Sequence, residues 1–325
     1  LKSKKGINLP ETILKNSALT SADKRNVKKG IQLGVDWIAL SFIQSPEDIK
    51  DLRKICKKNV SIMAKIEKPT ALNHINKITE LADGLMIARG DLGVELPIQD
   101  VPSWQKRIIR EARMQGKPVV VSTQMLESMI TSKTPTRAEV SDVATAIYEG
   151  ADAVMLSAES AAGKFPKEAV KTMDSIAIEV ESDPNHRNIL AAQREGKKES
   201  VADAIVSAAR EIAETTEIKA ICCFSQSGTT ALLVSRERPH IPIIAMTALL
   251  STARRLCLTW GAHAVLTSEL DRFKMAVVNA SRAAVKYNFA DEEDFIVVTA
   301  GVPFNVPGST NILRVACLLY TSPSP

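Results

Sequence analysis

The chain has 325 residues, of which 45% are hydrophobic and 24% charged, and its formal net charge is +5. This length suits two domains, and the composition is that of a globular protein with a sizeable core. The charge is small for the length and no arginine-rich arm or aromatic–basic stripe occurs, so no nucleic-acid partner is expected. The apolar runs are too short to cross a bilayer, so no membrane partner is expected either.

The five cysteines include no C-x-x-C pair, and the four histidines lie far apart. This spacing predicts neither a disulfide framework nor a zinc site. Reduced thiols are typical of the cytosol, so we expect a cytoplasmic protein. The two ends break the patterns described below: the chain starts at Leu1 in mid-pattern, and residues 318–325 have no periodicity. We expect an N-terminally truncated chain with a non-native tail over 318–325.

Five short apolar segments recur along the first half of the chain, and each is nearly continuous, as in strands covered on both faces. They span residues 35–40, 60–64, 84–88, 118–121 and 151–156. Apolar residues at a spacing of three predict one helix between two of these strands, at Leu72, Ile75, Ile78 and Leu81.

Local signals mark the ends of further helices. Ser45, followed by proline and then Asp48, indicates a helix start, and Thr136 with Glu139 has the spacing of a capping box. Gly116 indicates a helix end before the fourth strand.

Alternating strands and helices predict a parallel sheet, which is either an open doubly wound sheet or a closed barrel. Polar groups follow every predicted strand, at Ser41, Lys65, Glu67, Arg89, Asp91, Thr123, Gln124, Ser157 and Glu159. Polar groups at every strand end are typical of a TIM barrel, whereas an open sheet concentrates its ligands at one point. We therefore predict an α/β fold with a partial (β/α)8 TIM barrel over residues 1–183, whose first three strands would precede Leu1.

A hydrophilic stretch over residues 184–200 predicts a linker to a second domain. The strands expected there span 220–224, 243–246, 264–266, 295–299 and 312–315. With helices between them, they predict a smaller α/β C-terminal domain over residues 201–317.

The segment around Lys65 and Glu67 carries the strongest chemical signal. Residues two apart on a strand share a face, so both side chains are expected to point into the site at the strand's end. Asp91 follows the next strand, and two carboxylates with water and substrate oxygens are a usual Mg²⁺ site. A cation beside a metal predicts charge neutralisation on a transferring phosphoryl group.

The turn from Ala88 through Arg89 and Gly90 to Asp91 allows a close approach of the backbone to an anion. The Arg89 side chain has two open interpretations, a structural ion pair or a direct contact with substrate.

The motifs at residues 63–67, 87–95, 123–129 and 135–144 resemble those of pyruvate kinases, in the same order and with the same spacing. The resemblance runs from about Lys4 to about Val315. It implies that phosphoenolpyruvate and ADP give pyruvate and ATP in glycolysis. It also implies a homotetramer.

The resemblance implies a role for each candidate residue. Lys65 would stabilise the phosphoryl group, Glu67 and Asp91 would ligate Mg²⁺ or Mn²⁺, and backbone amides from Ala88 to Asp91 would hold the substrate carboxylate. Thr123 would lie near the enolate carbon. Ser41 and Ser157 either line the site or cap their strands.

Some features of the resembling family are not found in this sequence. Three barrel strands, with an arginine for the phosphoryl group and the ligands for K⁺, and a small lid domain are expected before Leu1. This chain alone is therefore expected to lack full activity.

A hydroxyl-rich turn in the second domain is a candidate anion site, with Ser225, Ser227, Gly228, Thr229 and Thr230 between a strand and a helix. A plain helix-capping turn explains the same residues equally well. In the resembling family this turn can hold a phosphate of a sugar-phosphate or nucleotide effector.

Two rival functions fit part of this pattern. One is another Mg²⁺-dependent enolate enzyme on a similar barrel, which would not be expected to combine Lys65 two residues before Glu67 with the Thr123 motif. The other is a binding protein with a decayed site, and intact Lys65, Glu67, Asp91 and Thr123 argue against it.

Overall fold

The computed structural model describes residues 18–57, 60–193, 200–269, 272–304 and 309–318. The chain divides into two compact units, an N-terminal unit over 1–193 and a C-terminal unit over 194–325. Each unit is described by itself.

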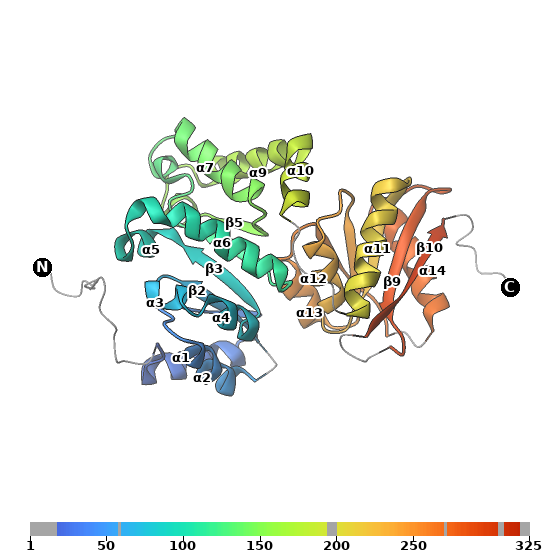
Figure 1. The fold of residues 1–325 in the computed structure, drawn as a ribbon, viewed down its shortest axis with the longest axis horizontal. Helices are drawn as coiled ribbons and strands as arrows, with labels where there is room; N and C mark the ends of the chain where they lie inside the picture. The colour runs from blue at the N-terminus through green and yellow to red at the C-terminus, as the bar shows by residue number, and fades with distance from the viewer. Residues whose placement is uncertain (1–17, 58–59, 194–199, 270–271, 305–308, 319–325) are drawn as a thin grey trace, which may run out of the picture. The chain divides into compact units, whose positions relative to one another are not determined.

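The N-terminal unit contains a five-stranded parallel sheet (Figure 1). Its strands are β1 (Trp37–Leu40), β2 (Ser61–Ile66), β3 (Gly84–Ala88), β4 (Val119–Ser122) and β5 (Ala153–Met155). They lie side by side in chain order, β1-β2-β3-β4-β5, without the reversal that defines a doubly wound sheet. All five predicted strands are present, and their order is that of consecutive barrel strands.

Along the chain, the helices of this unit precede, separate and follow the strands (Figure 1). They are α1 (Ser21–Gln32), α2 (Pro46–Cys56), α3 (Pro69–Leu72), α4 (Ile75–Leu81), α5 (Arg89–Glu95), α6 (Val101–Met114), α7 (Arg137–Tyr148), α8 (Ala158–Ala161), α9 (Pro166–Ser182) and α10 (Pro184–Ala192). Two short 3₁₀ turns span Ile98–Asp100 and Glu127–Ile130.

The predicted helix boundaries are confirmed at three places. Asp48 accepts a hydrogen bond from the Ser45 amide at 3.0 Å, one residue before α2. Glu139 and Thr136 bond reciprocally at the start of α7, at 2.7 and 3.3 Å. Gly116 follows α6 with φ of +64°, a conformation that favours glycine.

The single helix predicted from Leu72 to Leu81 is wrong in detail, because the structure divides it into α3 and α4. Asn73 and His74 lie between the two helices, and both are exposed. The spacing of three persisted across the break because both pieces bury apolar residues on the same side, Leu72 in α3 and Ile78 in α4.

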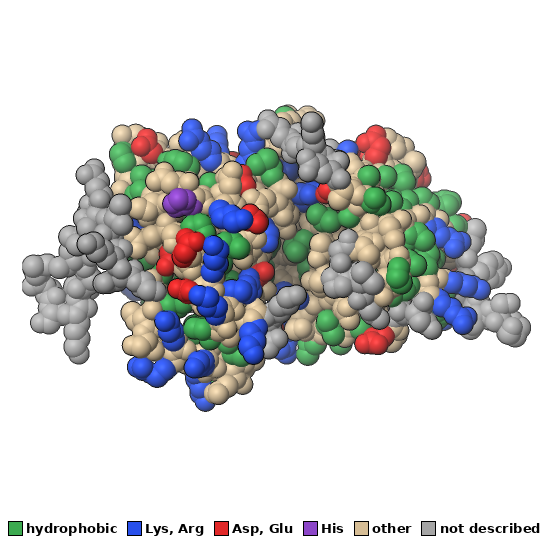
Figure 2. Space-filling model, turned by 60° about the horizontal axis from the view of Figure 1, so that its bottom comes forward, with side chains coloured by type: hydrophobic (Ala, Val, Ile, Leu, Met, Phe, Trp, Pro, Cys, Tyr) green, Lys and Arg blue, Asp and Glu red, His purple; other side chains and the backbone are tan. Residues whose placement is uncertain are grey.

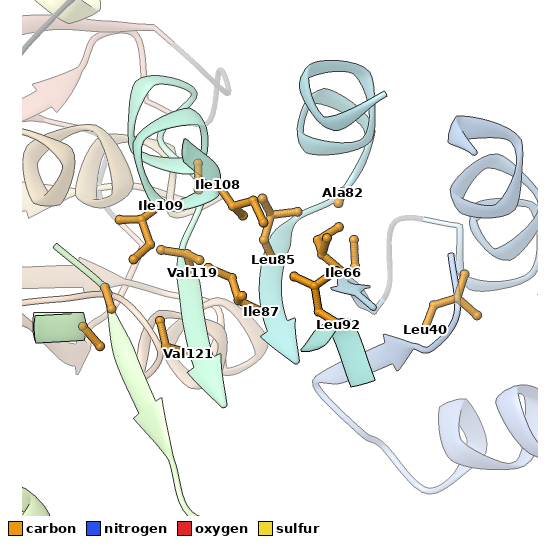
Figure 3. Close-up of a cluster of buried hydrophobic side chains, with 14 of the residues drawn as sticks. Leu40, Ile66, Ala82, Leu85, Ile87, Leu92, Ile108, Ile109, Val119 and Val121 are labelled. Carbon is orange, nitrogen blue, oxygen red and sulfur yellow. The ribbon is translucent and has the colours of Figure 1, made fainter. Parts of the chain in front are cut away.

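The core of the unit lies between the sheet and its helices (Figure 3). Ile66, Leu85, Ile87, Val119 and Val121 contribute from the strands, and Ile108 and Ile109 contribute from α6. In β2, Ile62, Ala64 and Ile66 belong to this cluster, so the alternate residues Met63 and Lys65 lie on the opposite face of the sheet.

The C-terminal unit contains a second five-stranded sheet, in the order β10-β9-β6-β7-β8. Its strands are β6 (Ile218–Phe224), β7 (Ile243–Thr247), β8 (Ala262–Leu266), β9 (Phe295–Gly301) and β10 (Thr310–Cys317), and only β10 pairs antiparallel. Its helices are α11 (Val201–Thr215), α12 (Thr229–Arg236), α13 (Leu250–Leu256) and α14 (Phe273–Lys286).

Both faces of this sheet are buried. On one face α14 packs its alanines against β6, β7 and β9, and on the other face α11, α12 and α13 cover the strands. Adjacent residues of β6 therefore face different helices, with Cys222 in one cluster and Cys223 in the other. Burial raises the pKa of Cys222 to about 12.

The predicted linker over 184–200 overlaps helical structure. Residues 184–192 form α10, which packs against α9, and the compact N-terminal unit runs to Gln193. Residues 194–199 and, in the predicted tail, residues 319–325 lie outside the described residues.

The surface formed by α1 and α2 is rich in lysine and arginine (Figure 2). Lys24, Arg25, Lys28 and Lys29 are exposed on α1. On α2, Lys50 and Lys54 form ion pairs with acidic neighbours on the same helix. Across the described residues, no helix is both long and apolar enough to span a membrane.

Candidate active site

Lys65 and Glu67 lie together at the carboxyl end of β2. The Lys65 ammonium is 2.6 Å from Glu67 Oε1 and donates a hydrogen bond to Ser41 Oγ at 2.8 Å. Ser41 follows β1, the neighbouring strand, so two strand ends meet here. The predicted shared face of Lys65 and Glu67 is thus reproduced.

The Glu67 carboxylate is 1% exposed, and its two oxygens differ in their partners. Oε2 accepts a hydrogen bond from the Phe42 amide at 2.5 Å. Oε1 contacts the Lys65 ammonium as an ion pair but accepts no hydrogen bond with suitable geometry from any described residue. A buried carboxylate oxygen without a hydrogen bond has a lone pair available for a ligand.

Phe42, which supplies the amide to Glu67, has φ of +55°. This conformation is uncommon for a residue with a side chain and is found mostly where the surroundings impose it. It aims the Phe42 amide at Glu67, while the Phe42 side chain remains 47% exposed.

Asp91 lies in the first turn of α5, directly after β3. Because Ile66 pairs with Ile87, the register of β2 and β3 brings Glu67 beside Ala88, three residues before Asp91. Asp91 is half-buried, and its carboxylate forms no hydrogen bond or ion pair with any described residue.

These two carboxylates fit a hard divalent cation. Glu67 Oε1 and the Asp91 oxygens are anionic and are supplied by neighbouring strand ends. Glu67 Oε1 contacts the Lys65 ammonium, and Asp91 has no hydrogen-bond donor among the described residues. Mg²⁺ is typically held by one or two carboxylates with water and substrate oxygens. A cluster of three or more His, Cys, Asp or Glu side chains suited to a metal does not occur in the described part of the chain.

The Arg89 side chain is occupied by protein contacts. Its guanidinium bonds to Asp142 at 2.6 Å, to the Thr123 carbonyl at 2.8 Å and to Met125 Sδ at 2.8 Å. The side chain is only 11% exposed. Of the two interpretations left open, these contacts favour the structural ion pair.

Thr123 follows β4 and lies against the turn at Gly90. Its hydroxyl accepts a hydrogen bond from the Gly90 amide at 2.7 Å and donates one to the Ser122 carbonyl at 2.6 Å. Thr123 has φ of +72° and Gln124 has φ of +55°. A β-branched residue in this region is a genuine outlier, and such strain costs about 1–3 kcal/mol.

Ser157, at the end of β5, is half-buried, and its amide donates to Glu159 Oε2 at 2.7 Å. The other Glu159 oxygen accepts from the Leu126 amide at 3.2 Å. Glu159 thus ties the loops after β4 and β5 together, which is a structural role that its position in the sequence did not reveal.

The hydroxyl-rich turn of the C-terminal unit is held by contacts among its own residues. The Ser225 hydroxyl accepts from the Gly228 amide at 2.9 Å, and the Ser227 and Thr229 hydroxyls lie 2.9 Å apart. The Thr230 hydroxyl is buried and lies 2.7 Å from that of Thr310 in β10. The turn caps α12 through Gly228, whose φ is +88°.

Comparison with known proteins identifies the chain's relatives. A family model described as "Pyruvate kinase, barrel domain" matches residues 1–170, and a second, described as "Pyruvate kinase, alpha/beta domain", matches residues 203–316. The chain belongs to the pyruvate kinase family.

Individual pyruvate kinases match nearly the whole chain. It is 50% identical to the pyruvate kinase of Methylorubrum extorquens, over 97% of this chain and 66% of the relative. It is 48% identical to a pyruvate kinase of Agrobacterium vitis, with the same coverage, and 44% identical to pyruvate kinase 2 of Synechocystis, over 97% of the chain and 53% of the relative. The chain thus spans about two thirds or less of these relatives.

Three features of this candidate site were missed by sequence reasoning. They are the identity of the Arg89 partner, Asp142, the Glu159 bridge and a buried ion pair between Lys68 and Glu95 at 2.5 Å. Each joins residues from different βα units, so the short-range spacing that found Lys65 and Glu67 carries no signal for them. A charged residue at a helix position that the core would bury, such as Glu95, was the one available hint.

Proposed function

We propose that the N-terminal unit supplies catalytic groups for phosphoryl transfer from phosphoenolpyruvate to ADP, giving pyruvate and ATP. The observation that carries this proposal is Glu67 Oε1, a buried and otherwise unsatisfied carboxylate oxygen next to the Lys65 ammonium. Membership of the pyruvate kinase family supports it.

Lys65 stabilises the transferring phosphoryl group. Its ammonium is held by Ser41 and Glu67 at the mouth of the strands and is partly exposed there. A fixed positive charge acts without reorganisation when charge develops on the phosphoryl oxygens. Ser41 therefore acts by orienting Lys65 as well as lining the site.

Glu67 and Asp91 hold the divalent cation, Mg²⁺ or Mn²⁺. When bound, such an ion neutralises the charge of phosphate and enolate oxygens. The contribution of the protein is the geometry: the Phe42 amide fixes one Glu67 oxygen, and the other, which is ion-paired with Lys65, is the one proposed to bind the ion.

Backbone amides from Ala88 to Asp91 bind the substrate carboxylate, and Thr123 lies near the carbon that receives a proton. The Gly90–Thr123 hydrogen bond supports a shared location for these groups, and the Gly90 amide would exchange this bond for one to the carboxylate when substrate binds. Ser157 lines the site at the end of β5. The ligands of K⁺ are proposed to come from segments that the relatives have and this chain does not include.

The C-terminal unit is proposed as the regulatory domain, with the turn at residues 225–230 receiving the phosphate of a sugar-phosphate or nucleotide effector. Thr230 would contribute through its backbone, because its hydroxyl is buried against Thr310. We further propose a homotetramer that works in glycolysis in the cytoplasm.

The decisive test uses a protein that carries this chain together with the remaining length of its relatives. Lys65→Met should lower kcat for ADP-dependent pyruvate formation with Mg²⁺ by about 10²–10³-fold, the effect of losing one preorganised donor. Lys50→Met, which removes an exposed cation from α2, is the matched control and should leave kcat unchanged. Equal kcat in wild type and Lys65→Met would show that Lys65 does not stabilise the transferring phosphoryl group.

A further inference from the structure

Lys68 and Glu95 form a buried ion pair that the reaction itself does not use. The Lys68 ammonium is 2.5 Å from Glu95 Oε1, and their side chains are 8% and 4% exposed. Neither side chain has another hydrogen bond or ion pair with a described residue. Among the described residues, each charge is therefore balanced by the other.

The two residues stand in a fixed relation to the two carboxylates of the proposed metal site. Lys68 directly follows Glu67. Glu95 follows Asp91 by four residues on α5, so both lie on the same face of that helix, one turn apart. The ion pair therefore connects the residue next to Glu67 with the residue one helical turn after Asp91.

Local helix electrostatics does not explain these positions. Lys68 is the N-cap of α3, where the helix favours an anion, and Glu95 is the last residue of α5, where it favours a cation. Burial adds a further cost to each charge unless it is paired. Both penalties are offset only when α5 is docked against the end of β2.

The orientation of α5 depends on such contacts because the helix is weak by itself. It has seven residues, and Gly90 and Gly93 are two of them. One apolar anchor, Leu92, is fully buried in the cluster that contains Ile66 and Ile87 (Figure 3). Arg89 and Gly90 hold the first turn of the helix through bonds to Asp142 and Thr123, and the Lys68–Glu95 pair provides a directional contact for its last turn.

We propose that Lys68 and Glu95 are positioning residues that hold Asp91 at the distance from Glu67 needed to bind one divalent cation. The inference rests on the proposed function, because it assumes that Glu67 and Asp91 are the metal ligands. It predicts the sign of the change in metal affinity when Lys68 is replaced. Removing a cation from beside a cation site should tighten binding if only charge matters, but it should weaken binding if position matters.

The experiment measures Mn²⁺ binding to the 325-residue chain by the electron paramagnetic resonance signal of the free ion. Lys68→Met should weaken binding about tenfold, in the range seen when groups supporting metal ligands are removed. Glu95→Gln should weaken it too, because the Lys68 ammonium loses its partner. Urea unfolding confirms that each variant is folded, and Lys68→Leu, which also removes the cation, carries the sign test if Lys68→Met does not fold.

The matched control is Arg53→Met. Arg53 pairs with Asp83 at 2.6 Å near the opposite ends of β2 and β3, so its loss breaks a partly exposed ion pair away from the carboxylates. Its Mn²⁺ affinity should stay within about twofold of wild type, since no group supporting the ligands is lost.

The Glu67→Gln variant distinguishes failure of the positioning inference from failure of the proposed metal site. If wild type binds Mn²⁺, Glu67→Gln abolishes binding, and the Lys68 and Glu95 variants bind as tightly as wild type or tighter, the positioning inference is overturned and the metal site stands. If wild type binds no better than Glu67→Gln, the proposed metal site is wrong, and the inference falls with it.

Discussion

The strand ends of the N-terminal unit and the turn at residues 225–230 look alike in sequence but differ in how their polar groups are satisfied. Both place polar side chains between a parallel strand and a helix. In the first, Asp91 has no hydrogen-bond donor among the described residues, and Glu67 Oε1 forms an ion pair with Lys65 but no well-formed hydrogen bond. In the second, the hydroxyls of Ser227, Thr229 and Thr230 pair with one another or with Thr310.

The two regions also differ in backbone conformation. In the N-terminal unit, Phe42 and Thr123 occupy left-handed conformations that disfavour their side chains. In the C-terminal turn the left-handed position is taken by Gly228, which accepts it without strain. Buried charge with incomplete hydrogen bonding, together with backbone strain, distinguishes a candidate active site from a well-capped turn. Position after a strand does not distinguish the two.

The largest expected effect tests whether the Arg89 side chain is structural. Arg89→Met removes charged hydrogen bonds to Asp142 and the Thr123 carbonyl and should destabilise the N-terminal unit by about 3 kcal/mol. Hydrogen exchange measured peptide by peptide should show the loss in the N-terminal unit and no change in the C-terminal unit. Arg25→Met, which removes an exposed cation from α1, should change neither.

A different outcome would indicate that the Arg89 side chain contacts substrate. If Arg89→Met leaves the stability of the N-terminal unit intact while phosphoenolpyruvate binding by the longer protein falls, the guanidinium contacts substrate and its protein contacts are incidental.

A smaller effect is expected from the buried hydroxyl pair of the C-terminal unit. Thr230→Val leaves the Thr310 hydroxyl without its partner and should cost about 1–2 kcal/mol in the free energy of unfolding of that unit. The double variant with Thr310→Val removes both hydroxyls and should recover most of that loss. A double variant as unstable as the sum of the two single variants would show that the hydroxyls contribute separately, and the pair would not explain why Thr230 is buried.

The elements that position the site were predictable because their signals are local. Every strand was found from a short apolar run, and the ends of α2, α6 and α7 were found from Asp48, Gly116 and Glu139. The break between α3 and α4 was missed because apolar spacing continues across it. A hydrophobic pattern reports which face is buried and not whether the backbone is continuous.

Within the site, local patterns were again predictive and long-range contacts were not. Lys65 and Glu67 were placed together because strand alternation puts them on one face two residues apart. The partner of Arg89 is 53 residues away in α7, and that of Lys68 is 27 residues away in α5. Such pairs depend on how consecutive βα units dock, so they become visible only in three dimensions.

The smallest effects contrast the two left-handed positions directly. Gly228→Ala places a Cβ 3.2 Å from Leu256 Cδ2 at φ of +88° and should destabilise the C-terminal unit by about 1–2 kcal/mol. Thr123→Gly should leave the stability of the N-terminal unit within about 0.5 kcal/mol of wild type. Relief of about 2 kcal/mol of strain offsets about 1 kcal/mol of chain entropy and about 1 kcal/mol for the lost Gly90 hydrogen bond. Hydrogen exchange in each unit measures the stability changes of the two variants. A loss of 2 kcal/mol or more in Thr123→Gly would mean that the Thr123 conformation stores no strain.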